Sequence, residues 1–511
     1  MIGLTVKNEN VLKIISMLQK IVFENEIVLY WDKQWHLPSG VEYRISCNGK
    51  GYARTKKTHC EIVGLQAETP YAVTVERLDE NGAGVETLFS ETIITSKKRK
   101  RIDVTKPPYN AVGDGKTLNT VALQRALDDC AAGETVYIPQ GTYLTGALKM
   151  HGDTELYLEK AAILQGTANV EDYLPKRWSR FEGIERECYA SLINIGNLDN
   201  KAGYTTKNVV IRGGGSIFGG GKALCDATIA TEQERLKGWY LENAEYIKTC
   251  ENEKTVAGRA RGRLVAVYNA ENVVFANVTF GFGAAWNLQF VYSKNIITYG
   301  CKIQSYGVWN GDGWDPDSSE NCVIFGTEFA THDDAIAIKS GKNPEGNSID
   351  RPTKCVRIFD CHGMRGIAIG SELSGGVEDV AVWDCQMNAF RVKTTKKRGG
   401  YVKNVRVYDS TFNADMRVTT RYAWNDDNLS AGTLTKLHNF HFENVKIIGY
   451  DNERQGDFPV APIMLLGFEK QTPIENVTVK NVVIGKRIDG ALPDFEIENV
   501  LGLKTENIQY E

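Results

Sequence analysis

A short motif recurs along most of this chain: Asn or Asp stands directly before Val or Ile at the start of a β-branched run. The steps from Asn272 to Asn295 and from Asp379 to Asn404 are 23 and 25 residues. A period in the twenties, built from strands and turns, is typical of a solenoid; leucine-rich repeats share the period, but their leucine pattern is absent. The repeat therefore predicts a parallel β-helix whose coils stack ~4.8 Å apart. The motif occurs at Asn208-Val209, Asn272-Val273, Asn295-Ile296, Asp379-Val380, Asn404-Val405, Asn444-Val445, Asn476-Val477, Asn499-Val500 and Asn507-Ile508.

The first 96 residues lack this repeat and alternate like the strands of a hairpin-rich sandwich. Examples are Ile27–Trp31 and Tyr43–Cys47, and turn pairs such as Asn48-Gly49 separate the runs. The stretch Leu65–Tyr71 resembles a fibronectin type III domain, where such a tyrosine often locks a corner of the sandwich. We interpret this part as a spacer or docking module.

We predict an all-β protein with two domains. A small fibronectin type III-like β-sandwich spans residues 1–96, and a right-handed parallel β-helix spans residues 102–511. The basic run at residues 97–101 between them has no interleaved aromatic residue, so we interpret it as a solvated linker. The length of 511 residues is ample for two such cores.

The net charge and the apolar runs of the sequence give no support for binding nucleic acid or a membrane. The formal net charge is −4, which offers no argument for binding nucleic acid or a membrane. The N-terminal stretch has no basic segment before a clean apolar core, and no apolar run approaches the ~20 residues of a membrane span. The eleven cysteines form no CxxC pair. We therefore expect reduced thiols and a cytoplasmic location.

The sequence also indicates how the first coil of the predicted β-helix is capped and where long loops leave the coils. A helix-like stretch, Val121–Cys130, lies between residues 109–117 and Val136–Tyr143. This order resembles the capped opening coil of pectin-degrading β-helix proteins, and a cap is needed because the first coil would otherwise expose an apolar end. Residues 168–262 depart from the repeat, so we predict long loops on one side of the solenoid, where binding clefts usually form.

Three aspartates carry the strongest chemical signal. Asp312 and Asp333 are 21 residues apart, close to one coil, and Asp334 is adjacent. Residues one coil apart lie on neighbouring strands, so three carboxylates would crowd one patch and raise at least one pKa. A glycosidase needs such a mixture of protonated and ionised carboxyls. The alternatives are a calcium site or turn caps, and both members of the adjacent pair can face a cleft only if the chain bends there.

Several motifs in this order resemble glycoside hydrolase family 28, the polygalacturonases, over residues 102–511. The family's Asn-Thr-Asp appears as Asn310-Gly311-Asp312, and its Asp-Asp pair as Asp333-Asp334. Its Arg-Ile-Lys appears as Arg391-Val392-Lys393, and its Ile-Gly-Ser as Ile369-Gly370-Ser371, extended by Glu372. The resemblance implies an inverting hydrolase of pectic poly- or oligosaccharides, without metal or cofactor. Asp333 would protonate the leaving oxygen, and Asp312 and Asp334 would activate water.

The resemblance also implies residues that bind the acidic substrate. Arg391 and Lys393 stand at i and i+2 of one strand face and suit a galacturonate carboxylate. The family's Gly-His-Gly is absent: Arg365 occupies the histidine position, and His362 lies three residues earlier. We expect Arg365 to point along the cleft to a substrate carboxylate, away from Asp333. The substrate-binding candidates are Arg391, Lys393, Arg365, Lys339, His362 and Asn310, with Lys339 open to a surface role.

Three alternatives remain. A pectate lyase shares the fold but needs calcium and a basic proton acceptor. A rhamnogalacturonan-specific galacturonidase differs in its substrate. A tailspike-like adhesin would bind carbohydrate without cleaving it. Segments such as Gly311–Asp317 resemble bacterial exo-acting members, which often carry a fibronectin-like domain, so we expect exo action. The sequence does not specify an oligomeric state.

Overall fold

The computed structural model describes residues 18–422, 429–449, 461–485 and 495–511. The chain divides into two compact units between Arg99 and Lys100. None of the helices described in either unit is long and apolar enough to cross a membrane.

The first unit is a sandwich of two antiparallel sheets with strand orders β1-β2-β5 and β4-β3-β6-β7. Trp31 and Tyr43 meet edge to face in its core, with ring centroids 5.2 Å apart. The backbone N–H of Gln66 donates to the hydroxyl of Tyr71 at 2.9 Å, which fastens a corner. The likeness to fibronectin type III stays a prediction. The strands are β1 (Gln19–Val22), β2 (Glu26–Tyr30), β3 (Tyr43–Cys47), β4 (Lys50–Thr55), β5 (His59–Val63), β6 (Pro70–Leu78) and β7 (Gly84–Ile94).

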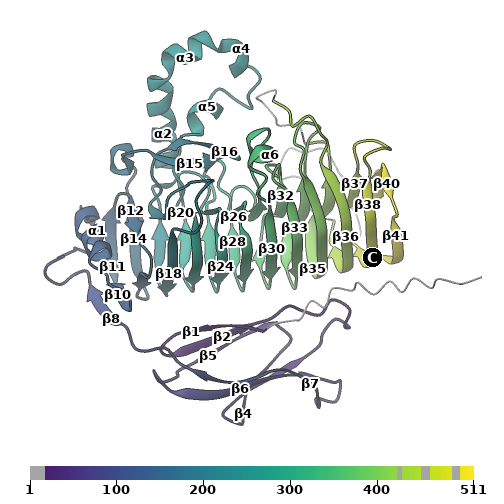
Figure 1. Cartoon of the computed structure of the whole chain (residues 1–511), viewed down its shortest axis with the longest axis horizontal. Helices are drawn as coiled ribbons and strands as arrows, with labels where there is room; N and C mark the ends of the chain where they lie inside the picture. The colour runs from purple at the N-terminus through teal and green to yellow at the C-terminus, as the bar shows by residue number, and fades with distance from the viewer. Residues whose placement is uncertain (1–17, 423–428, 450–460, 486–494) are drawn as a thin grey trace, which may run out of the picture. The chain divides into compact units, whose positions relative to one another are not determined.

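The second unit is a parallel β-helix, which confirms the predicted fold class. Its strands form three parallel stacks, and the chain visits each stack once per coil (Figure 1). The first stack contains β8 (Lys100–Asp103), β10 (Glu134–Ile138), β13 (Glu155–Leu158), β18 (Thr206–Gly213), β21 (Ala270–Ala276), β24 (Lys294–Tyr299), β27 (Glu320–Phe325), β30 (Thr353–Phe359), β33 (Val377–Trp383), β35 (Tyr401–Thr419), β36 (Lys436–Ile447), β38 (Ile474–Ile484), β40 (Val500–Leu501) and β41 (Lys504–Tyr510).

The second stack contains β9 (Asp114–Leu118), β11 (Gly141–Thr145), β14 (Ala162–Gly166), β19 (Ser216–Phe218), β22 (Thr279–Gly281), β25 (Lys302–Gln304), β28 (Glu328–Ala330) and β31 (His362–Gly363). The third contains β12 (Leu148–Met150), β17 (Ile193–Ile195), β20 (Val265–Tyr268), β23 (Leu288–Val291), β26 (Trp314–Asp317), β29 (Ile336–Ile338), β32 (Ile367–Gly370), β34 (Gln386–Lys393), β37 (Ile463–Leu466) and β39 (Phe495–Glu498), with β35 between β34 and β37.

The recurring asparagines explain how each coil turns. Asn272, Asn295 and Asn321 all have φ near +55°, a left-handed conformation that asparagine tolerates better than most residues. Their side-chain amides form a ladder: Asn272 donates to Asn208 at 3.0 Å, Asn295 to Asn272 at 2.9 Å, and Asn321 to Asn295 at 2.7 Å. One residue type therefore sets both the local bend and the contact between coils.

Apolar residues fill the interior of the coils, and a separate row of aromatic rings stacks from coil to coil along the first stack. Tyr299, Phe325, Phe359, Trp383 and Tyr408 follow one another on successive strands, with ring centroids 4.4–5.8 Å apart and nearly parallel planes. All five are buried. Such pairs add about 0.5–1.5 kcal/mol each beyond the burial of their area.

The first coil is closed by helix α1 (Thr120–Asp128), as the sequence predicted. Leu123, Ala126 and Leu127 are buried on the face that it presents to the core. The linker prediction was wrong at its C-terminal end. Lys100 and Arg101 lie in β8, which pairs with β10, and the Arg101 guanidinium covers the ring of Tyr137 at 4.7 Å.

The predicted loop region, residues 168–262, is only partly loop. Strands β17, β18 and β19 return to the stacks within it. The segments that leave the coils are η1 (Val170–Tyr173), the hairpin β15 (Arg177–Phe181) and β16 (Ile184–Cys188), and helices α2 (Gly221–Arg235), α3 (Lys237–Glu242), α4 (Ala244–Ile247) and α5 (Thr255–Gly258) (Figure 1). A short helix, α6 (Glu345–Ile349), follows β29.

Candidate active site

Two loops of adjacent coils bring the three aspartates together. Asp312 precedes β26, and the pair Asp333-Asp334 precedes β29, the next strand of the same stack. The N–H of Gly313 donates to the carbonyl of Asp334 at 3.0 Å, so the two loops lie directly on each other. A side chain at Gly313 would collide with the carbonyl of Ala335, and glycine permits this close approach. The 21-residue spacing thus placed Asp312 and Asp333 together correctly.

The chain bends at the adjacent pair, as the prediction required. Asp333 and Asp334 both line one pocket with Asp312. The pocket is small, about 110 Å³. Its walls are formed by Glu182, Glu251, Thr255, Arg259, Trp286, Asn310, Asp312, Asp333, Asp334, Lys339, Lys342, Gly370, Ser371, Glu372, Lys393, Arg398 and Tyr422.

The three carboxyls differ in their cationic partners. Lys339 Nζ donates to Asp312 at 3.1 Å, and Lys393 Nζ donates to Asp334 at 2.7 Å. Within the described parts of the chain, Asp333 has no lysine or arginine partner, and its Oδ1 accepts the backbone N–H of Asp334 at 2.9 Å. A nearby ammonium favours the ionised form of a carboxyl. The pairing therefore distinguishes Asp333 from the other two.

Asp312 also experiences a strong opposing effect. The residue is 3% exposed, and burial raises its pKa, with Asp333 and Asp334 adding to the rise. Lys339 acts in the opposite direction, and the resulting pKa of Asp312 is about 7. Asp312 therefore changes its protonation state near neutral pH.

A fourth aspartate lies behind the pocket. Asp315 on β26 is fully buried, and neither carboxyl oxygen has a hydrogen-bond partner within the described ranges. Burial raises the pKa of Asp315 well above its usual range, and Asp312 raises it further. A neutral carboxylic acid is the form that such surroundings favour.

Lys339 is not a surface lysine. It is 5% exposed, its ammonium lies 4.3 Å from the ring centroid of Trp286, and Glu372 Oε2 is 3.6 Å away. Burial lowers its pKa, but Asp312, Asp315 and Glu372 outweigh burial and hold the pKa well above the usual range. Burial raises the pKa of Glu372, yet Lys339 and Arg398 bring it to about 2. Lys339 thus connects two carboxylates of the pocket.

Lys393 and Arg391, both predicted to bind the substrate, lie in different surroundings. Lys393 lines the pocket but is bound to Asp334. Arg391 does not line it. Its Nη2 donates to the fully buried Asp415 at 3.0 Å, and Arg417 of the neighbouring strand pairs with the same carboxylate at 2.6 Å. A buried carboxylate is held by both guanidiniums, so Arg391 has a structural partner.

The structure does not bring His362 or Arg365 into the pocket wall either. His362 lies on β31 in the second stack, half exposed, with Nε2 3.5 Å from Asp360. Arg365 is half-buried and lies one coil beyond the Asp pair, since the carbonyl of Gly366 accepts the N–H of Ala335 at 3.0 Å. No ion pair joins Arg365 to Asp333 in the described structure. Asn310 lines the pocket, and its Oδ1 accepts from Arg261 at 2.6 Å.

The hairpin β15–β16 forms one end of the pocket. The carbonyl of Gly183 at its tip accepts the N–H of Lys342 at 2.9 Å. Gly183 has φ +74°, and an added Cβ would lie 2.5 Å from the nitrogen of Lys342. Glu182, next to it, lines the pocket and pairs with Arg259 at 2.7 Å. The tip and the 341–342 loop therefore fit closely together.

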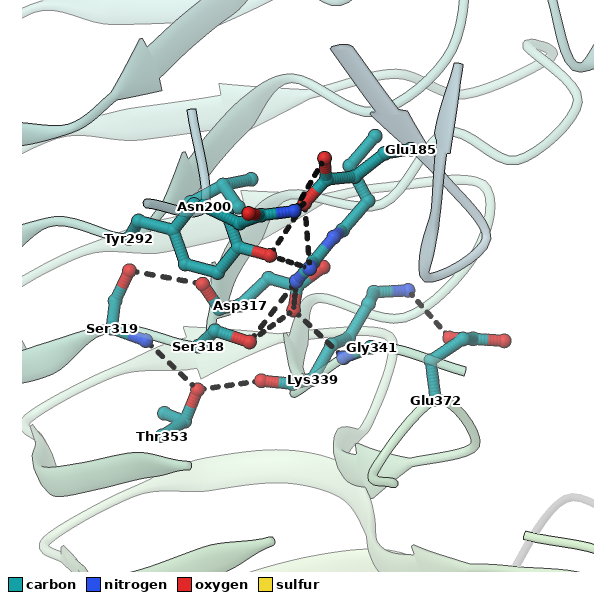
Figure 2. A network of polar contacts seen from close by, with 12 residues as sticks. Glu185, Asn200, Tyr292, Asp317, Ser318, Ser319, Lys339, Gly341, Thr353 and Glu372 are labelled. Atoms are coloured by element: carbon teal, nitrogen blue, oxygen red, sulfur yellow. Dashed lines mark hydrogen bonds and ion pairs between the residues drawn. The ribbon is translucent and has the colours of Figure 1, made fainter. Parts of the chain in front are cut away.

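A buried polar network holds this hairpin against the coils (Figure 2). Arg180 is fully buried, and its Nη1 donates to Asp317 at 2.9 Å and to Ser318 at 3.0 Å. Its Nη2 contacts the hydroxyl of Tyr292, which donates to Glu185 at 2.6 Å (Figure 2). Asp317 also accepts the N–H of Gly341 at 3.0 Å. Removal of one buried ionic partner typically costs 3–5 kcal/mol, so we expect this network to fix the pocket end.

Sequence reasoning missed several pocket residues. Glu182, Trp286, Lys342 and Tyr422 belong to no recognised motif and come from distant parts of the chain. Arg398 also belongs to no recognised motif, yet it is 1% exposed and donates to Asn343 at 2.7 Å. No sequence pattern marks these positions, because loops of different coils supply them.

The fold and the pocket together define a family. Residues 132–500 match glycosyl hydrolases family 28, and the chain belongs to this family. It is 30% identical over 340 residues to an exo-poly-alpha-D-galacturonosidase of Dickeya chrysanthemi, covering 63% of this chain and 56% of that protein. It is 29% identical over 322 residues to a Vitis vinifera protein named "Probable polygalacturonase", covering 59% of each. The chain thus spans less than two thirds of the length of these two relatives.

Solved structures agree with the architecture. The family 28 exopolygalacturonase of Yersinia enterocolitica aligns with a TM-score of 0.81 at 25% identity, covering 96% of this chain and 98% of that one. An exopolygalacturonase of Thermotoga maritima aligns with a TM-score of 0.65 at 24% identity, covering 80% of this chain and 92% of that one, and shares the fold.

Proposed function

We propose that this protein hydrolyses α-linked galacturonate in pectic polymers or oligomers, with inversion and from a chain end. The observation that carries the proposal is the set of three aspartates in one pocket, two paired with lysines and the third without a lysine partner among the described residues. Family membership and the exo-acting relatives support it.

The pairing suggests the division of labour. Asp334, bound to Lys393, serves as a base toward water. Asp312 joins it in that role once its proton has left. Asp333 lacks a cationic partner in the described chain and protonates the leaving oxygen. Inversion requires acid and base carboxyls ~6.5–9.5 Å apart, with the water between them.

The pocket also carries cationic groups that suit an acidic sugar. Lys342 and Arg398 line it close to Glu372, whose pKa they help to lower, and Arg259 lies at the hairpin end. Guanidinium groups bind carboxylates bidentately, and ammonium groups act as point charges. We propose that these residues, with Asn310 and Lys339, receive the galacturonate unit.

Exo action has a structural basis in the hairpin. The tip at Gly183 meets Lys342, and an open groove along the coils would need a gap there. We propose that the tip blocks the groove at this point, so that a polymer enters by a chain end. The named activities of the Dickeya and Yersinia proteins agree with this proposal.

Product analysis on polygalacturonate and on rhamnogalacturonan, with and without chelator, tests the function. We expect saturated galacturonate released from chain ends of polygalacturonate, with inverted configuration by NMR, and no loss of activity in chelator. An unsaturated, ultraviolet-absorbing product would establish a lyase instead. Release from rhamnogalacturonan alone would establish the rhamnogalacturonan-specific alternative, and binding without cleavage would establish the adhesin.

We also propose that the protein acts in a reducing compartment such as the cytoplasm, on oligomers. All eleven cysteines are free, and most are buried. Cell fractionation with an antibody against the chain tests this proposal, and recovery outside the cytoplasm would contradict it.

A further inference from the structure

A second hollow of about 410 Å³ adjoins the active-site pocket. We call it the side hollow. The segment between α4 and α5 borders both spaces. Glu251 and Thr255 line the active-site pocket, whereas Asn252, Glu253 and Lys254 between them line the side hollow. One strip of five residues therefore forms a shared border of the two spaces.

The two loops that carry the aspartates also border both spaces. Trp309 lines the side hollow, and Asn310 lines the pocket. In the same way His332 lines the side hollow, and Asp333, the proposed acid, lines the pocket. The side hollow therefore begins one residue away from the reacting groups.

The part of the side hollow formed by Trp309 is held rigidly by its neighbours. Cys225 and Ile229 of α2 form a buried cluster with Ala257 of α5 and Val308, and Trp309 packs against it. Arg261 is fully buried and donates to the carbonyl of Trp309 at 2.7 Å. Its guanidinium also lies 4.5 Å from the ring centroid of Trp309. The indole is thus held in place before any ligand arrives, which lowers the entropic cost of binding.

The chemistry of the side hollow suits an acidic sugar. The ammonium of Lys254 has no acidic partner within the described ranges, and it is exposed to the hollow. Lys222, the other lysine of the lining, is already paired with Asp226. The carboxylate of Glu253 can accept from sugar hydroxyls, and Trp309 offers an aromatic surface. A free cation beside hydroxyl acceptors and an aromatic ring matches a uronate better than a neutral sugar.

We propose that the side hollow binds a second acidic sugar of the same oligogalacturonate, with the carboxylate of that sugar on Lys254. The active-site pocket holds one unit, and the side hollow extends recognition to another. This inference rests on the proposed function, because the occupant of the pocket is taken to be galacturonate.

Three substrates and two matched variants test the inference in the full chain. The substrates are 4-nitrophenyl α-galacturonide, with one carboxylate, and di- and trigalacturonate. For Lys254→Ala, we expect kcat/KM for the oligomers, relative to the nitrophenyl glycoside, to fall roughly 10-fold through KM, as a lost charge-assisted contact would cause. Lys248→Ala is the control, since Lys248 is exposed in the same insertion and pairs with Glu245.

The outcomes separate the two proposals. If the wild type cleaves none of the three substrates, the proposed function fails. If the wild type cleaves them but Lys254→Ala leaves the ratio unchanged, or lowers all three rates equally, the side hollow does not bind a uronate. Lys254→Arg keeps the charge and should restore most of the ratio. Failure of that rescue, with an unchanged melting temperature, would also overturn the inference.

Discussion

The ammonium of Lys339 lies 3.1 Å from Oδ2 of Asp312 and also sits over the ring of Trp286. The indole face and the carboxylate surround the same cation, so the charge of Asp312 depends on a lysine that solvent barely reaches.

Lys339→Met should move the acidic limb of kcat/KM to higher pH. Burial raises the pKa of Asp312 to about 7, and Lys339 lowers it, so loss of the lysine leaves the raising effects unopposed. As a base, Asp312 must be ionised, and the limb should shift upward by about one unit. A pH–rate profile measures the shift. Lys302→Met, at an exposed surface pair, is the control, and a limb that stays in place would contradict the role given to Asp312.

Asp333→Asn should lower kcat by at least ~10²-fold while KM changes little, because the amide keeps the shape but cannot donate the proton. Steady-state kinetics on digalacturonate provide the measurement, and circular dichroism checks the fold. Asp128→Asn on the exposed face of α1 should behave as wild type. Retention of most of the kcat would show that another carboxyl is the acid, with Asp312 the first to examine.

Asp315→Asn should raise the free energy of unfolding relative to the wild type, and the difference should grow as the pH rises. The folded-state pKa of Asp315 is raised, so the proton it holds favours folding at low pH, and this contribution is lost as pH climbs above the unfolded value of about 3.9. The amide mimics the neutral acid at every pH. Urea unfolding at about pH 4 and about pH 8 should show a larger stability advantage of the variant over the wild type at the higher pH. An equal difference at both values would mean that Asp315 is ionised in the folded state.

Gly183→Ala should open the closed end of the pocket. The added methyl group would lie 2.5 Å from the backbone nitrogen of Lys342, so the hairpin tip must move away. We expect slower release of terminal galacturonate and a faster fall in polymer viscosity per bond cleaved. Gly238→Ala on α3, where nothing lies within 4 Å, is the control. If the fall in viscosity and the rate both match the wild type, exo action does not depend on the contact between Gly183 and Lys342.

Arg365→Ala tests whether this half-buried arginine reads the substrate. Because Arg365 lies outside the pocket wall and forms no ion pair with Asp333 in the described structure, its loss should leave kcat, KM and the alkaline limb of the pH profile close to the wild-type values. A rise in KM alone would show that Arg365 does contact the substrate. Arg125→Ala on the exposed face of α1 is the control. A collapse of kcat, or a shifted alkaline limb, would show that Arg365 acts on the catalytic carboxyls.

The solenoid and its carboxylate cluster were visible in the sequence because each depends on spacing along one coil. Asn272 and Asn295 mark successive turns, and Asp312 and Asp333 stand nearly one turn apart. Both are local consequences of a regular repeat, in which the strand register carries a residue onto its neighbour one coil away.

Contacts outside that register could not be predicted. Arg391 looked available for substrate, because nothing marked Asp415 as a buried partner on the next strand. Glu182 reaches the pocket from a hairpin about 150 residues before Asp334, and only folding reveals that its loop closes over that coil. A sequence shows which residues share a face, but the paths of inserted loops depend on packing that has no period.

The asparagine ladder continues from Asn321 to residue 355, where cysteine takes the place of asparagine in the same left-handed conformation. The positions 272, 295, 321 and 355 show that the coil carrying the aspartate pair is the longest of these three, although its strands keep register with their neighbours. Extra residues were accommodated between strands without disturbing the frame. In evolutionary terms, such a scaffold lets the loops around the carboxylates lengthen, shorten or be exchanged one coil at a time, so substrate preference can diverge among descendants while the catalytic groups stay where they are.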